Sequence, residues 1–223
     1  MTQEGDRTLL AKEEVEESAP ARAYWRWYLG SAIGVGILAV LGLQAWSLLQ
    51  ANWYSQKAFT ALRDGDSETA LELYDRALQI APSSDEIWLN RGYALSQMRR
   101  FQGQLASCER AADLNPRSAN AYNCQGLALY RLGRSQAAIA AYNTALDRDP
   151  KFYQAWNNRG ETLAAEGRFE EALAAFNVAI SYQQDYAFAL TNRGNALLRL
   201  ERYPEALDAF ARAIDSEPAY SYA

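Results

Sequence analysis

The amino-acid sequence predicts an all-α protein, a solenoid of five helix–turn–helix repeats preceded by one transmembrane helix. Two patterns lead to this prediction. Glycine recurs at a constant spacing of 34 residues, at Gly92, Gly126, Gly160 and Gly194, and a fixed period of this length is typical of stacked helical repeats. Residues 29–49 form an apolar run without a charged side chain, which is long enough to cross the hydrocarbon core of a bilayer as a helix.

The composition argues against several classes of function. The chain has 223 residues, of which 49% are hydrophobic and 22% charged, as in globular proteins. Its formal net charge is −5, so it lacks the basic footprint of a nucleic-acid-binding protein. It has no histidine and two cysteines, which leaves no histidine general base and no four-cysteine metal site. We therefore expect no catalytic residue, no cofactor, no metal and no nucleic-acid partner.

The first 28 residues are predicted to be an acidic, disordered tail that ends in an aromatic cluster. Residues 1–20 hold six acidic side chains against Arg7 and Lys12, with few apolar residues to bury. Aromatic rings favour the headgroup level of a bilayer. They flank the apolar run on both sides: Tyr24, Trp25, Trp27 and Tyr28 before it, and Trp46, Trp53 and Tyr54 near its end. We interpret residues 29–49 as a transmembrane helix in contact with lipid, with a buried core helix or a cleaved signal peptide as alternatives.

Lys and Arg are more numerous before this run than after it, where Lys57 and Arg63 follow. Because positive residues stay on the cytoplasmic side, this asymmetry favours a single-pass protein with its repeats in a periplasm or lumen. The cytoplasmic or stromal side remains the alternative. Gly30 and Gly34 form a small-xxx-small pattern that would allow two such helices to self-associate, although glycine is common in membrane helices.

The rest of the chain divides into five units of equal length: 51–84, 85–118, 119–152, 153–186 and 187–220. Further positions recur at the same spacing, with alanines at 77, 111, 145, 179 and 213 and prolines at 82, 116, 150 and 218. Small residues at fixed positions are expected where two helices cross, since a larger side chain would overpack the crossing. Each proline ends one helix, because it cannot donate to the preceding turn. No unit can bury its apolar face alone, so the units must stack.

This pattern resembles the tetratricopeptide repeat family. The resemblance implies a right-handed superhelix whose first helices line a concave groove for partner proteins or extended peptides. It also implies that recurring positions of the first helices contact the ligand. To these we add Asn90, the one residue that matches the clamp with which some members of the family bind a C-terminal carboxylate. The clamp itself is rejected, because its Lys and Arg are missing. The groove residues carried over are Glu86, Leu89, Asn90, Tyr93, Asn120, Asn123, Leu127, Tyr130, Arg131, Gln154, Asn157, Glu161, Phe188, Asn195 and Arg199.

Three departures from the pattern bear on packing. Ala58 replaces the recurring glycine in the first unit, and Cys108 replaces the aromatic residue that follows the glycine by 16. Cys108 and Cys124 belong to helices that should be neighbours. We interpret them as two buried thiols, with a disulfide as the alternative. The last helix ends without a following repeat to cover Leu207, Phe210 and Ile214, so we expect self-association or partner docking there, unless its polar residues suffice as a cap.

An N-terminal anchor followed by such repeats looks like the thylakoid anchors that assist photosystem assembly. The function predicted from the sequence is thus a non-enzymatic, membrane-anchored scaffold that aids assembly of a membrane protein complex. This rests on arrangement alone. The alternatives are an envelope chaperone-like or cytochrome-maturation accessory protein, or a permanent subunit of a larger complex.

Overall fold

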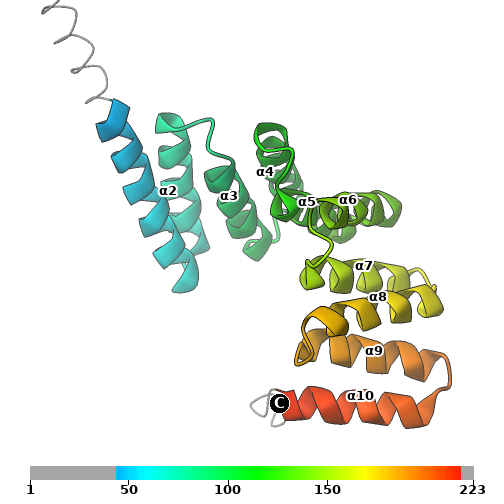
Figure 1. Ribbon diagram of the computed structural model, residues 1–223. Helices are drawn as coiled ribbons and strands as arrows, with labels where there is room; N and C mark the ends of the chain where they lie inside the picture. The colour runs from blue at the N-terminus through cyan, green and yellow to red at the C-terminus, as the bar shows by residue number, and fades with distance from the viewer. Residues whose placement is uncertain (1–43, 217–223) are drawn as a thin grey trace, which may run out of the picture. The chain divides into compact units, whose positions relative to one another are not determined.

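The computed structural model describes residues 44–216, and from Ser47 onward these residues form one compact unit of helices stacked in chain order (Figure 1). The predicted tail, 1–28, the Gly30 and Gly34 face and most of the predicted membrane span lie outside the described residues. The first described helix covers 44–63. Within the described range the chain contains helices and no strands, so the predicted helical solenoid is confirmed. The right-handed sense of its superhelix stays a prediction.

The helices alternate between first and second members of each repeat. After helix 44–63 come α2 (Ser67–Ile80), α3 (Asp85–Gln97), α4 (Phe101–Leu114), α5 (Ala119–Arg131), α6 (Ser135–Arg148), α7 (Tyr153–Ala165), α8 (Phe169–Tyr182), α9 (Ala187–Arg199) and α10 (Tyr203–Ser216). Each helix contacts the next one in the chain, and the first helices α3, α5, α7 and α9 also contact one another in succession. The first helices therefore form one continuous face.

Local sequence explains where the helices begin and end. Asp66, Ser84 and Ser118 precede helices and accept a hydrogen bond from a backbone N–H of the first turn, which satisfies a donor that the helix cannot. The turn inside three of the repeats contains a glycine with positive φ, as at Gly133 and Gly167, a conformation that glycine adopts without a steric cost.

The recurring glycines lie where the two helices of one repeat cross. A Cβ atom built on Gly126, Gly160 or Gly194 would lie 2.5 Å from a ring carbon of Tyr142, Phe176 or Phe210, respectively. These aromatic rings come from the second helix of the same repeat. The predicted reason for small residues at this position is therefore confirmed, and the partner at the crossing is an aromatic ring.

One repeat lacks the ring. At Gly92 the nearest atoms to an added Cβ are the Sγ atoms of Cys108, at 2.9 Å, and Cys124, at 3.2 Å. The two sulfurs are joined by a disulfide that links α4 to α5. The interpretation as two separate thiols was therefore wrong, and the alternative holds: stacking of adjacent repeats brings the two side chains together.

The predicted single-pass membrane location is corrected by the structure. Within residues 44–216, no helix combines the length and the apolar character needed to cross a bilayer. Residues 44–49, the described part of the predicted span, continue without a break into a repeat helix that contains Lys57 and Arg63 and buries Ala51 and Ala58. The predicted location is contradicted by this finding, and neither it nor its orientation is retained.

The crossing contact predicts opposite effects for two glycine-to-alanine changes. Gly160→Ala should destabilise the protein by about 1–3 kcal/mol, because the added methyl collides with the Phe176 ring. Gly103→Ala should stabilise it by up to about 1 kcal/mol, because alanine is the better helix former and its Cβ would meet Leu95 at an ordinary distance of 3.4 Å. Urea unfolding followed by circular dichroism measures both. Equal effects of the two changes would contradict the crossing assignment.

The disulfide predicts a redox-dependent stability. The cysteines are 16 residues apart, and closing a loop of that length stabilises a folded chain by about 3 kcal/mol. We expect the unfolding temperature to fall when the protein is reduced, and to fall equally in the Cys108→Ser/Cys124→Ser double variant. Alkylation without prior reduction, read by intact-protein mass spectrometry, should add no label to the unfolded chain; two labels would show that the bridge is absent.

Candidate functional site

The residues predicted to line the groove all lie on first helices, and we call the surface of α3, α5, α7 and α9 that they share the first-helix face. Glu86, Leu89, Asn90 and Tyr93 lie on α3. The others are Asn120, Asn123, Leu127, Tyr130 and Arg131 on α5, Gln154, Asn157 and Glu161 on α7, and Phe188, Asn195 and Arg199 on α9. Because these helices contact one another in succession, side chains from neighbouring repeats meet along this face.

Two of the predicted residues take part in contacts between repeats. The Nδ2 of Asn158 on α7 donates to Oδ1 of Asn123 on α5 at 3.0 Å, and the Nδ2 of Asn192 on α9 donates to Oδ1 of Asn157 on α7 at 3.0 Å. Asn123 and Asn157 are buried. Their side-chain carbonyls therefore hold successive first helices in register, which sequence spacing alone did not indicate.

Three other predicted residues line a single cavity between the last two repeats. Glu161 on α7 and Asn195 and Arg199 on α9 surround a volume of about 200 Å³. Phe169, the first residue of α8, forms part of the wall, and the Arg199 guanidinium carbon lies 4.5 Å from the centroid of its ring. A cation over an aromatic face is attracted by the ring quadrupole, so Phe169 helps to hold the arginine at the cavity.

The cavity contains one carboxylate, one guanidinium and side-chain amides from Asn192 and Asn195. An amide can donate to and accept from the backbone of an extended peptide. A guanidinium can bind a carboxylate with two parallel hydrogen bonds, and a carboxylate can accept from a cationic side chain. This set suits recognition of a polar, charged segment. Within the described part of the chain, no three metal-ligating side chains are grouped together.

Glu161 acts on the hydroxyl groups of two nearby tyrosines. Burial raises the pKa of the Tyr130 hydroxyl, and the neighbouring Glu161 carboxylate raises it further. Burial likewise raises the pKa of Tyr186, to which Glu161 adds a smaller contribution. These phenols therefore remain neutral hydrogen-bond donors.

The remaining predicted residues do not join this cavity. Glu86 borders a smaller one of about 140 Å³ with residues of helix 44–63, and Phe188 borders an apolar one of about 530 Å³ between α9 and α10. Tyr93 is half-buried, and burial raises the pKa of its hydroxyl. Asn120 and Arg131 are exposed, and Leu89, Asn90, Leu127 and Gln154 are half-buried. The structure thus divides the predicted groove into separate sites.

Sequence reasoning missed Phe169, because it considered first helices alone. A signal was present in the repeat pattern: Phe101, Phe169 and Tyr203 each begin a second helix, at spacings of one or two repeat lengths. An aromatic residue at that point can reach the face of the next first helix.

The two kinds of asparagine on α7 and α9 should respond differently to truncation. Asn157→Ala removes the acceptor of a buried hydrogen bond and should destabilise the protein by about 1–3 kcal/mol. Asn195→Ala, at an exposed position, should leave the unfolding free energy within about 0.5 kcal/mol of the wild type. Chemical unfolding of both variants tests this, and a stable Asn157→Ala protein would contradict a structural role for the amide pair.

The comparisons with known proteins agree with this geometry. Family models described as tetratricopeptide repeat match residues 51–94, 85–118, 125–189 and 187–220. The chain therefore belongs to the tetratricopeptide repeat family.

Solved structures with the same fold include MamA, with 22% identity, a TM-score of 0.62 and coverage of 78% of this chain and 94% of that one. YrrB, described as a protein with an unusual peptide-binding site, has 24% identity, a TM-score of 0.56 and coverage of 74% and 85%. PilW, described as a type IV pilus biogenesis factor, has 24% identity, a TM-score of 0.69 and coverage of 74% and 77%. No curated protein sequence matches the chain. At these identities the likeness shows the fold alone.

Proposed function

We propose that this protein is a non-enzymatic scaffold that binds an extended segment of a partner protein along its first-helix face. The observation that carries the proposal is the cavity between α7 and α9. There Glu161 and Arg199, of opposite charge, lie with the amides of Asn192 and Asn195 around about 200 Å³. In this proposal the amides bind the ligand backbone, and the two charged residues select its side chains.

The half-buried aromatic and aliphatic residues of α3 and α5 extend the proposed contact. Tyr93, Leu127 and Tyr130 offer apolar area and, in the tyrosines, hydroxyl donors whose raised pKa keeps them protonated. Tyrosine provides such contact area at a low cost in conformational entropy. The peptide-binding site named for YrrB supports this use of the fold by analogy.

The proposal is limited to partner binding by the repeats. The roles in photosystem assembly, cytochrome maturation or the cell envelope depended on the membrane location, which the structure contradicts, so they are not part of it. The expectations of no enzymatic activity, no cofactor and no nucleic-acid partner stay predictions.

Selection of binders from a displayed library of random peptides, with the full chain as bait, tests this function. We expect selected peptides to contain an acidic residue that pairs with Arg199. Arg199→Gln should weaken their binding by roughly 10- to 100-fold, because a charge-assisted hydrogen bond contributes about 1.5–3 kcal/mol. Arg199→Glu should shift the selection toward basic peptides.

Glu170→Gln is the matched control, since Glu170 is exposed on α8 and does not border the cavity. It should bind the selected peptides as the wild type does. If Arg199→Gln binds equally well while its unfolding transition is unchanged, the cavity is not the recognition site. Recovery of no peptide at all would count against groove binding itself.

A further inference from the structure

The two ends of the repeat array present the two surfaces that meet at every internal junction. In the interior, Leu173 and Ile180 of α8 are covered by α9 and are 7% and 8% exposed. The residues at the same positions of α10, Leu207 and Ile214, are 71% and 52% exposed. The outer face of α10 is thus an apolar surface shaped by the repeat to receive a first helix.

The register of such a contact is defined by the internal junctions. The Nε of Arg91 on α3 donates to Asp75 on α2 at 2.7 Å, and the Nε of Arg193 on α9 donates to Asn177 on α8 at 2.9 Å. In both cases the first helix of one repeat pairs with the same position of the preceding second helix. This antiparallel pairing specifies which residues would meet if another first helix packed on α10.

Helix 44–63 is the first helix that has no preceding repeat within the described residues, and its equivalent face is exposed. Trp53 lies at the position where later repeats bury Ala121, Ala155 and Ala189 completely, yet Trp53 is exposed. Lys57 lies at the position of Arg91 and Arg193, and its Nζ is 5.7 Å from the centroid of the Trp53 ring. The indole and the ammonium therefore project from the same side of the helix.

A tryptophan in place of a small alanine needs a recess on the opposing surface, and the far end of the array contains one. The cavity of about 530 Å³ between α9 and α10 is bordered by Ala187, Phe188, Phe210, Ala213 and Ile214. At the α7–α9 junction, the rings of Tyr153 and Tyr186, with centroids 4.9 Å apart, pack against the core cluster that contains Ile180 and Ala189. Ala187 stands where the preceding repeat has Tyr153, which leaves the space open for an incoming ring.

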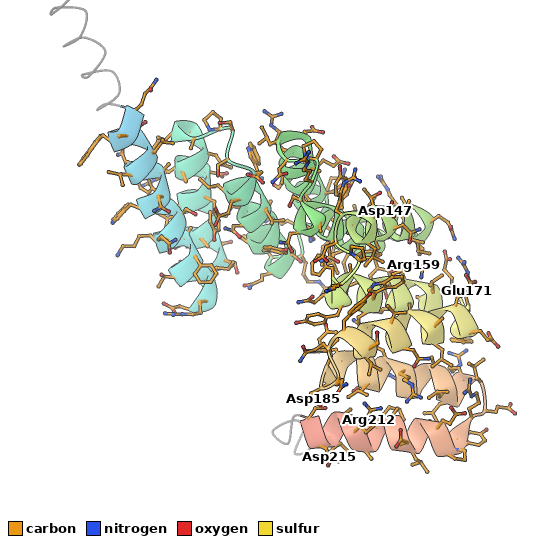
Figure 2. All side chains as sticks on the ribbon, in the orientation of Figure 1. Asp147, Arg159, Glu171, Asp185, Arg212 and Asp215 are labelled. Atoms are coloured by element: carbon orange, nitrogen blue, oxygen red, sulfur yellow. A yellow bond between two sulfur atoms is a disulfide. The ribbon has the colours of Figure 1, made fainter. Side chains whose placement is uncertain are left out.

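The charges of the two surfaces are also complementary. Residues 47–63 contain Lys57 and Arg63 and no acidic side chain, whereas α10 contains Glu205, Asp208 and Asp215 against Arg212. Figure 2 labels Arg212 and Asp215 near the carboxyl end of α10. In the internal register Lys57 would lie opposite Ala211, with Asp208 and Asp215 about one turn away on either side. Opposite charges at these positions favour this pairing and its orientation.

We propose that copies of this chain associate head to tail, with helix 47–63 of one copy packed on α9 and α10 of another as the first helix of a sixth repeat. Trp53 enters the α9–α10 cavity, and Lys57 pairs with the acidic residues of α10. The contact joins two different surfaces, so it is heterologous and can propagate into a ring or a filament. Because Phe188 and Asn192 border the cavity that Trp53 would fill, the contact covers the adjoining edge of the first-helix face on α9. The first-helix face on α3, α5 and α7 stays open to a partner, so the assembly would present a longer binding surface than one chain.

The test uses the full chain and two variants that each remove one surface. Trp53→Asp removes the helix 47–63 surface, and Ile214→Asp removes the α10 surface; both residues are exposed, so the fold should tolerate the changes. Tyr182→Asp, at an exposed apolar position at the end of α8, is the control. Mass is measured by sedimentation over a concentration series, and circular dichroism verifies folding.

We expect the wild type and the control to form oligomers that grow with concentration, and each surface variant to lose this growth. An equimolar mixture of the two variants should form pairs and stop there, because each variant retains one surface of the heterologous contact. Lys57→Glu should weaken association, because it places a negative charge opposite the acidic residues of α10. Adding Asp208→Lys and Asp215→Lys to the Lys57→Glu variant should restore association.

Each of the following outcomes would overturn the proposal. A wild type that is monomeric at every concentration would show that copies do not stack. If a variant without residues 217–223 associates while the wild type does not, the α10 surface is covered by residues 217–223 of the same chain. Association retained by Trp53→Asp but lost by Ile214→Asp would indicate a symmetric α10–α10 contact. A mixture that behaves like its separate components would exclude the pairing of the two surfaces.

Discussion

The packing of an aromatic ring against a glycine determines how closely the two helices approach in each of the last three repeats. Tyr142, Phe176 and Phe210 fill the space that a glycine Cβ would occupy, so the first helix lies directly on the aromatic ring of the second. Dense packing of this kind leaves little freedom in the position of either helix. In those repeats this contact fixes how the first helix, and with it the side chains on its face, lies on the second helix.

Where the ring is missing, the same space is filled from two repeats. Beside Gly92 the Sγ of Cys108 takes part of the volume, and the Sγ of Cys124 from the next repeat takes the rest. Gln104, Ser107 and Arg91 lie around this junction, and the Arg91 guanidinium donates to Ser107 Oγ at 2.7 Å. A covalent and polar junction thus replaces an apolar one, and it keeps α4 and α5 together.

The first-helix face contains residues that hold the repeats together and residues that border the proposed binding cavity. The side-chain carbonyl oxygens of Asn123 and Asn157 each accept a hydrogen bond from an asparagine of the next repeat. Asn195, one repeat after Glu161, is instead exposed beside a cavity. The difference lies in the position within the repeat: Asn123 and Asn157 share one position, whose equivalent on α9 is Thr191, whereas Asn195 shares the position of Glu161. The proposed binding cavity and the proposed contact between copies both involve α9.

The repeat length, the helix pairs, the crossing glycines and the membership in a helical-repeat fold were predictable from the sequence, because each depends on positions within one repeat that recur at one period. The location and the contacts of individual groove residues were not predictable from the sequence. Glu161 and Arg199 border one cavity, Cys108 is bonded to Cys124, and Asn157 pairs with Asn192 across repeat boundaries. A period does not say which residues of adjacent repeats face each other. Stacking fixes that register through side-chain packing, so the tertiary structure alone decided which predicted ligands are buried between repeats and which border a cavity.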